Sequence, residues 1–174
     1  MRNVDKSGDL NKVLRYQVCK HKQSLINKVV IQNIEGFEEE VPLIFNDPVP
    51  DDLLVNAVKL ISYKLPIDYV DFLKTTNGCM LFDQENSLYS IEAVLETKDV
   101  TDSTYGLPEL LIVAYILQDY IMINLKEVAE GKQDYMYTID AYSPIDCLKS
   151  LNCDFQTWLN RFILCQGNKY WEWL

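Results

Sequence analysis

Apolar residues recur at helical spacing near the start of the chain. Asp9, a residue type that caps helices, precedes apolar positions about 3.6 residues apart. These positions are Leu10, Leu14, Val18, Leu25 and Val29. The spacing predicts a helix over this stretch. Residues 32–50 contain Gly36 and several prolines, so we expect a loop there, with a short strand at Val41–Phe45.

Two more helices are expected between residues 51 and 78. Asp51 and Asp52 place negative charge at the start of the first, where the helix dipole is positive. Its inward positions are Leu53, Leu54, Ala57, Val58 and Ile61. The next helix begins at Pro66, whose missing N–H has no helical partner in the first turn. Asn77-Gly78 ends it, because both residue types tolerate a left-handed backbone.

The pattern then changes to that of strands. Cys79–Phe82 and Leu88–Ile91 flank the polar turn Asp83–Ser87, and we expect a short helix at Glu92–Glu96. Both flanking runs are rich in apolar residues and too short for helices. This stretch therefore predicts a pair of strands followed by a helix.

A second group of strands is predicted further along. Leu110–Leu117 and Tyr120–Leu125 are apolar runs separated by Gln118-Asp119, which predicts a hairpin. Lys126–Gln133 surrounds a glycine and predicts a loop. Tyr135–Ala141 alternates between two kinds of side chain, which indicates a strand with unlike faces.

The last element is an amphipathic helix that Asp154 caps and Gly167 ends. Its apolar positions are Phe155, Trp158, Leu159, Phe162 and Ile163. Helices first, strands in the middle and a helix last predict a single α+β domain with helices packed on a largely antiparallel or mixed sheet. We place an N-terminal helical extension and loop at residues 1–47 and the main domain at 48–174.

The composition predicts a hydrophobic core that needs no disulfide or metal, and the charged residues are unevenly distributed along the chain. The chain has 174 residues, 48% of them hydrophobic, and a net charge of −10. Residues 1–32 hold seven Lys/Arg against two Asp/Glu, whereas residues 33–174 hold nine against twenty-four. The main body is therefore expected to repel nucleic acid and anionic membranes and to attract basic surfaces.

Cysteine usage and apolar runs indicate a cytoplasmic protein. The five cysteines include no C-x-x-C pair; they are Cys19, Cys79, Cys147, Cys153 and Cys165. In a chain of this size they predict reduced thiols. The longest apolar run, Leu110–Leu117, is far shorter than the ~20 residues that cross a bilayer, and residues 1–10 do not resemble a signal peptide.

One helical segment resembles a family signature. The run from Leu65 to Gly78, LPIDYVDFLKTTNG, is similar to the L-P-x-x-Y-x-x-F-L…N-G pattern of the SUKH superfamily, and the later elements follow a similar order over roughly residues 48–165. The motif residues Leu65, Tyr69, Phe72 and Leu73 are expected in the core, so the pattern indicates a scaffold. The superfamily often has a second glycine where this chain has Cys79.

No catalytic or metal-binding constellation is evident. His21 is the only histidine and lies in the basic leader, where we expect a surface position. Cys147 and Cys153 have no supporting histidine for a zinc site. The acidic clusters are Glu38-Glu39-Glu40, Asp51-Asp52 and Asp83-x-Glu85. Turns and helix starts keep such carboxylates ionised, and Asp83–Ser87 lacks the glycine and distal glutamate of a calcium loop. We therefore predict no enzyme, metal or cofactor.

The resemblance implies a protein that binds another protein. The superfamily joins fungal regulators of cell-wall synthesis with many bacterial immunity proteins, so in a bacterium we expect a chain that neutralises a toxin with a basic active-site surface, such as a nuclease. The alternatives are a regulatory scaffold for endogenous partners and a carboxylate-dependent hydrolase. The oligomeric state, monomer or homodimer, stays open. The expected contact residues are Asp83, Glu85, Tyr89, Asp119, Trp171 and Trp173.

Overall fold

An antiparallel sheet runs through the part of the chain that the computed structural model describes, residues 27–32, 35–82 and 85–173. Its eight strands lie in sequence order, and each pairs antiparallel with the next. The strands are β1 (Asn27–Gln32), β2 (Glu38–Phe45), β3 (Cys79–Leu81), β4 (Asn86–Leu88), β5 (Leu110–Ile116), β6 (Asp119–Asn124), β7 (Met136–Asp140) and β8 (Lys149–Ser150). The expected α+β class is confirmed.

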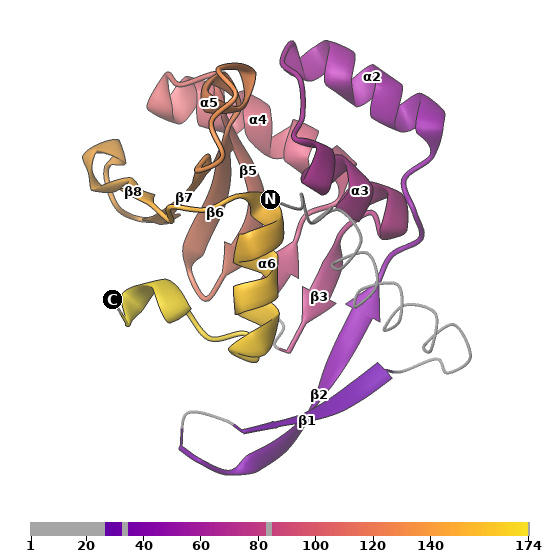
Figure 1. The fold of residues 1–174 in the computed structure, drawn as a ribbon, viewed down its shortest axis with the longest axis vertical. Coiled ribbons are helices and arrows are strands. Elements are labelled where there is room, and N and C mark those ends of the chain that lie inside the picture. Colours follow the sequence, from indigo (N-terminus) through magenta and orange to yellow (C-terminus); the bar gives the residue numbers. More distant parts are fainter. Residues whose placement is uncertain (1–26, 33–34, 83–84, 174) are drawn as a thin grey trace, which may run out of the picture.

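Helices occupy the connections between strands and the C-terminal part of the chain (Figure 1). Those in the described residues are α2 (Asp51–Ile61), α3 (Ile67–Thr75), α4 (Ile91–Tyr105), α5 (Leu125–Ala129) and α6 (Phe155–Leu164), with short 3-10 turns η2 (Ile145–Cys147) and η3 (Tyr170–Glu172). The β1–β2 hairpin extends away from the other elements in Figure 1. The helices α2 and α3 both lie between β2 and β3 in sequence.

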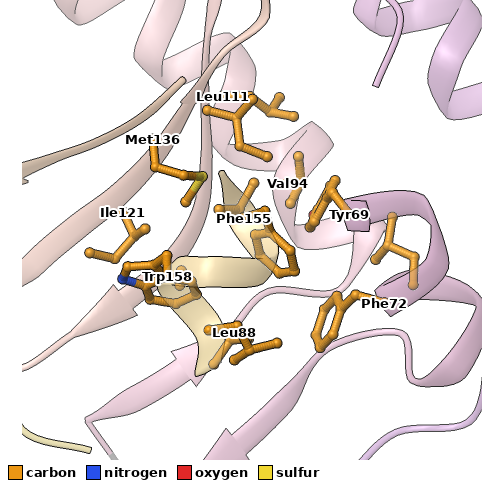
Figure 2. Close-up of a cluster of buried hydrophobic side chains, with 14 of the residues drawn as sticks. Tyr69, Phe72, Leu88, Val94, Leu111, Ile121, Met136, Phe155 and Trp158 are labelled. Carbon is orange, nitrogen blue, oxygen red and sulfur yellow. The ribbon is translucent and has the colours of Figure 1, made fainter. Parts of the chain in front are cut away.

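The main core lies between one face of the sheet and the helices. Alternate strand residues point to opposite faces, and one set packs against α3, α4 and α6, as Figure 2 shows for Leu88, Ile121 and Met136. Aromatic rings fill the contact between α3 and α6. Phe155 lies 5.0 Å from Tyr69 and 5.3 Å from Phe72 between ring centroids. Such contacts add to the free energy gained by burying large rings.

The Asn77-Gly78 pair joins α3 to α4. The Asn77 Oδ1 accepts a hydrogen bond of 2.8 Å from Ile91 N, and its Nδ2 donates to Glu92 Oε2 at 2.8 Å. Gly78 has φ +83°, and a Cβ there would stand 2.6 Å from Ser90 N and 2.7 Å from Leu88 O. Only glycine fits this close approach. The motif is thus architectural, as the sequence predicted.

Other motif positions agree with that interpretation, with small differences at the ends of the helix. The four apolar motif side chains are buried; they are Leu65, Tyr69, Phe72 and Leu73. Pro66 is the N-cap of α3 and not its first helical residue. The helix ends at Thr75, and Thr76 continues in an extended conformation. Cys79, at the place of the frequent glycine, is a buried residue of strand β3.

A half-buried carboxylate, that of Asp68, joins α3 to the start of α6. Asp68 accepts hydrogen bonds from the Tyr135 hydroxyl at 2.7 and 2.8 Å and from Gln156 N at 2.9 Å. Burial raises the pKa of Asp68, although these hydrogen bonds oppose the shift. Asp154 completes the helix start by accepting from Thr157 N at 2.7 Å, which confirms it as the expected N-cap.

The N-terminal prediction is wrong where the structure can test it. Val29 lies in strand β1 and faces Val41 of β2, not on a helix. Its neighbours are β-branched, and pairing with β2 decides their conformation. The expected short strand at Val41–Phe45 is longer, Glu38–Phe45. The helical positions 10–25 lie outside the described residues, and the division at residue 48 stays a prediction.

Three later elements also differ from their predictions. Helix α4 extends to Tyr105, well beyond the short helix expected at Glu92–Glu96, and buried Lys98 bonds Asp102 and the carbonyl of Pro108 at its end. Strand β4 ends at Leu88, before the expected Ile91. The predicted loop after β6 begins with helix α5, which Asn124 caps. For α4 and α5, the polar contacts of Lys98 and Asn124 form only when the chain folds, so the local pattern does not show these boundaries.

Within the residues that the structure describes, no helix is both long and apolar enough to span a membrane.

Candidate protein-binding face

The sheet has a second face, on the side away from the main core. Paired residues of antiparallel strands share a face. A row of such pairs crosses the sheet from β2 to β6; its members are Ile44, Met80, Ser87, Tyr115 and Tyr120. All five retain exposed surface, and Ile44 is 50% exposed. A smaller apolar cluster containing Ile112 and Met122 covers the adjoining part of this face.

Two tyrosines form the β5–β6 end of this row. Tyr115 of β5 and Tyr120 of β6 are direct partners, with ring centroids 5.7 Å apart and ring planes at 59°. The hairpin between them turns at Leu117 and Gln118, which have φ values of +45° and +73°. Left-handed backbone at both turn positions matches the twist of a tight hairpin. The turn therefore fixes which tyrosines meet.

Tyr89 joins the pair from the end of β4. Its backbone N–H donates to Val113 O at 2.9 Å, which holds it beside β5. Burial raises the pKa of Tyr89 to about 12, and the nearby phenols of Tyr120 and Tyr115 contribute. At neutral pH the Tyr89 hydroxyl is therefore protonated and can both donate and accept hydrogen bonds.

Tyr142 projects from the turn after β7 and is 85% exposed. Asp140 fixes this turn, because its Oδ1 accepts from Tyr142 N at 2.9 Å and from Ser143 Oγ at 3.3 Å. The turn is also tied to the β5–β6 hairpin, since Ala141 N donates to Gln118 O at 2.8 Å. A large exposed ring on a fixed turn is well suited to a protein contact.

The charges near these rings are negative. Desolvation raises the pKa of Tyr115, and Tyr142, Glu85, Tyr120 and Asp140 raise it further through their charge. The charged side chains that act on Tyr115 are thus both acidic. Among the described lysines and arginines, none lies within ion-pair distance of Asp140. We call the five residues Tyr89, Tyr115, Tyr120, Tyr142 and Glu85 the tyrosine face.

The structure brings together two of the residues that the sequence proposed as contacts. Glu85 and Tyr89 both belong to the tyrosine face, on either side of β4. Asp83 lies outside the described residues. The role of all three in binding stays a prediction.

Two other proposed contacts meet each other instead. Asp119 is 6% exposed, and its carboxylate accepts from Lys169 Nζ at 2.9 Å and from Trp171 Nε1 at 2.9 Å. These bonds fasten the C-terminal tail to the start of β6. Trp173, two residues further, is 67% exposed. Asp119 and Trp171 therefore have an internal structural role, whereas Trp173 is accessible to a partner.

Sequence reasoning missed Tyr115, Tyr120 and Tyr142. The available signal was the hairpin register, which pairs residues at equal distances from the turn. A turn at Gln118-Asp119 would pair Tyr115 with Met122 and Leu117 with Tyr120, a shift of two positions that keeps each side chain on its face but separates the two tyrosines. The observed turn at Leu117-Gln118 pairs Tyr115 with Tyr120.

The acidic clusters considered for catalysis are solvated where the structure describes them. Glu38, Glu39, Glu40, Asp51 and Asp52 are exposed. The half-buried carboxylate of Asp68 accepts hydrogen bonds from a tyrosine hydroxyl and from the start of α6, which is a structural arrangement. Among the described residues, no group of three or more His, Cys, Asp or Glu side chains is placed to hold a metal ion.

Comparison with known proteins assigns the scaffold. The SMI1 / KNR4 family (SUKH-1) matches residues 48–161, and the chain belongs to this family. Two proteins of Bacillus subtilis (strain 168) are similar to it. The uncharacterized protein YobM is 31% identical, with 63% of this chain and 62% of YobM covered. The uncharacterized protein YnaB is 26% identical, with 77% of this chain and 90% of YnaB covered. The chain thus spans less than two thirds of YobM.

Proposed function

We propose that the chain is a non-catalytic immunity protein that neutralises a protein toxin by direct binding in the cytoplasm. The observation that carries this proposal is the tyrosine face: four tyrosines and the carboxylate of Glu85 at the part of the second sheet face where strand residues keep exposed surface. Tyrosine supplies large, rigid contact area with little loss of conformational entropy, and it is enriched at binding hot spots.

The charge of the chain fits a basic partner. The net charge is −10, and the acidic residues are concentrated in residues 33–174. Toxins that act on nucleic acids or other polyanions have basic active sites, and an acidic surface accelerates association with them by electrostatic steering. The family membership supports the proposal because the superfamily includes immunity proteins alongside regulators.

The proposed function predicts protection of a cell from the toxin encoded immediately upstream of the gene. Co-expression of the chain with that toxin is expected to restore growth, and the two proteins are expected to co-purify. Equal killing with and without the chain, together with no complex, would refute the proposal. If the chain instead captures an endogenous cytosolic protein, the regulatory alternative is supported.

Two single-residue variants test whether the tyrosine face carries the protective activity. Tyr142→Ala removes the most exposed ring of the tyrosine face, whereas Leu164→Ala removes a similarly exposed side chain at the end of α6. Protection is expected to weaken with the first variant and to persist with the second. Loss of protection with both variants, or with neither, would count against the tyrosine face as the binding surface.

A further inference from the structure

The two edge strands of the sheet, β1 and β8, differ in how readily another strand can pair with them. Strand β8 contains only Lys149 and Ser150, and short edge strands that carry lysine resist such pairing. Strand β1 has six residues, three of them β-branched and none of them proline, and its ladder with β2 has no bulge. Among the described residues, no strand pairs with the outer side of β1. That side is therefore an edge that a further strand can extend.

The register of the β1–β2 hairpin shows which backbone groups of β1 point outward. In an antiparallel ladder, pairs that exchange hydrogen bonds alternate with pairs that exchange none. Lys28 faces Pro42, which has no backbone N–H, so this pair is of the second kind. Val30 and Gln32 follow at intervals of two residues, and Gln32 N donates outside the ladder, to Gln166 Oε1 at 3.0 Å. The backbone N–H and C=O groups of Lys28 and Val30 therefore point away from β2.

The side chains on this edge favour an added strand. Val30 is 62% exposed, and the hairpin that carries it extends away from the other elements (Figure 1). The charge of Lys28 is already matched, because its Nζ donates to Glu40 Oε2 at 2.9 Å. Lys28 and Val30 lie on the second sheet face, since their partners on β2 alternate with Ile44 along that face. An exposed β-branched residue beside outward backbone groups is typical of an edge that pairs with another chain.

A second copy of the chain matches this edge in its backbone groups. When two β1 strands pair antiparallel about Val29, Lys28 of each copy faces Val30 of the other, and their outward N–H and C=O groups bond each other. The hydrogen bond from Gln32 to Gln166 is retained in this register. No two like charges face each other across the new ladder.

The charges at the two ends of β1 also favour an antiparallel copy. Residues 1–26, which join β1 at Asn27, contain six Lys/Arg and two Asp/Glu. The opposite end of β1 lies beside the exposed residues Glu38, Glu39 and Glu40 of β2. Antiparallel pairing brings the basic junction of one copy next to the acidic end of the other, which is a complementary arrangement.

We propose that the chain forms a homodimer in which two β1 strands pair antiparallel, with Val29 at the two-fold axis, and join the two sheets into one. Both copies use the same edge, so pairing consumes it, and the short β8 strands remain at the ends; assembly therefore stops at two chains. Because paired residues share a face, the tyrosine faces of both copies lie on the same side of the joined sheet. This dimer goes beyond the proposed function and forms without a toxin.

Analytical ultracentrifugation of the full chain tests the dimer over concentrations from the low micromolar to the near-millimolar range. A reducing agent is present, because Cys147 is exposed and could otherwise link two chains. We expect a reversible monomer–dimer equilibrium in the micromolar range, since one short strand from each copy makes a small contact. A chain that stays monomeric at the highest concentration, or that forms assemblies larger than two, would overturn the proposal.

Val30→Lys tests whether β1 carries the contact. Within its own hairpin the new side chain faces Glu40, which favours the folded strand, but across the dimer it faces Lys28 of the second copy. The dissociation constant of the dimer is expected to rise about tenfold, since the unfavourable pair occurs twice. Val55→Lys is the matched control: it adds the same charge at a side chain of α2 that is 54% exposed, and the dimer is expected to persist unchanged. Equal effects of the two variants would refute pairing through β1.

Val30→Pro tests the backbone contact separately. It removes the outward N–H, and with it half of the hydrogen bonds between the copies, whereas the pairing of Val30 with Glu40 uses no such bond. The dissociation constant is expected to rise at least about tenfold, and the circular dichroism spectrum of the dilute chain is expected to stay unchanged. A dimer that persists in both Val30 variants uses another surface, and the β1 pairing is then wrong whether or not the chain neutralises a toxin.

Discussion

Asp119 and Trp171 are joined by a hydrogen bond of 2.9 Å from the indole Nε1 to the carboxylate, although 52 positions separate them. Lys169 donates to the other oxygen of the same carboxylate at 2.9 Å. The side chain of Asp119 is 9% exposed and that of Lys169 16%. One carboxylate at the beginning of β6 therefore holds two residues of the C-terminal tail.

Removing this carboxylate is expected to destabilise the fold. Asp119→Ala removes the 2.9 Å partner of the largely buried Lys169 ammonium and leaves it only the longer ion pair of 3.6 Å to the exposed Glu172, which costs about 3 kcal/mol of unfolding free energy. Denaturant unfolding monitored by tryptophan fluorescence measures the loss, with Asp146→Ala as the exposed control. A stability equal to that of the unaltered chain, combined with lost partner binding, would instead make Asp119 a contact residue.

Gly78 should tolerate no side chain. Gly78→Ala would place a Cβ 2.6 Å from Ser90 N with φ at +83°, so backbone must move, and we expect a loss of at least about 3 kcal/mol. Gly131→Ala is the matched control. Its φ is +78°, but no atom lies within 4 Å of the added Cβ, so a loss of about 1 kcal/mol is expected. Equal losses in denaturant unfolding would show that close packing at Gly78 is not limiting.

The Asp68 carboxyl is expected to titrate above the usual aspartate value of about 3.9. The folded state then keeps this proton at pH values where the unfolded chain has lost it. The contribution of Asp68 to the unfolding free energy therefore falls as the pH rises from about 4 through its folded pKa, and is constant above it. Carbon-13 titration of the carboxyl measures this pKa directly.

A second variant tests the cause of that shift. Tyr135→Phe removes a hydrogen bond that lowers the pKa of Asp68, so the carboxyl is expected to titrate higher still. Asp154→Asn removes a negative neighbour and should move the pKa of Asp68 the opposite way. A pKa at or below 3.9 in the unaltered chain would contradict burial as the dominant influence.

Much of the fold follows from local sequence signals. The start of α2 at Asp51, the N-cap at Asp154 and the buried positions Tyr69 and Phe72 are confirmed. Each depends on capping or on a helical period, which few residues determine. The α+β class follows from their order along the chain.

Other features depend on partners that are distant in sequence. Val29 fits a helical period, but pairing with Val41 makes it part of a strand. The turn at Leu117-Gln118 lacks the glycine or asparagine that signals a tight hairpin, so its register was not predictable locally. Because that register decides whether Tyr115 and Tyr120 are direct partners, the sequence predicted only part of the candidate site.

We expect the tyrosine face to contribute to partner binding and little to the stability of the fold. Tyr142 is 85% exposed, so Tyr142→Ala is expected to change the unfolding free energy by less than about 0.5 kcal/mol. The same variant is expected to weaken partner affinity by at least about 2 kcal/mol, as measured by calorimetry. Loss of both stability and affinity would mean that the ring supports the fold.

Hydrogen–deuterium exchange of the chain with and without the toxin encoded beside it tests the central claim most directly. Our account predicts slower amide exchange on binding around residues 85–89, 115–120 and 140–143, with little change in α2. Protection concentrated on α2 or on the exposed β1–β2 hairpin, with none at Tyr115, Tyr120 and Tyr142, would contradict it.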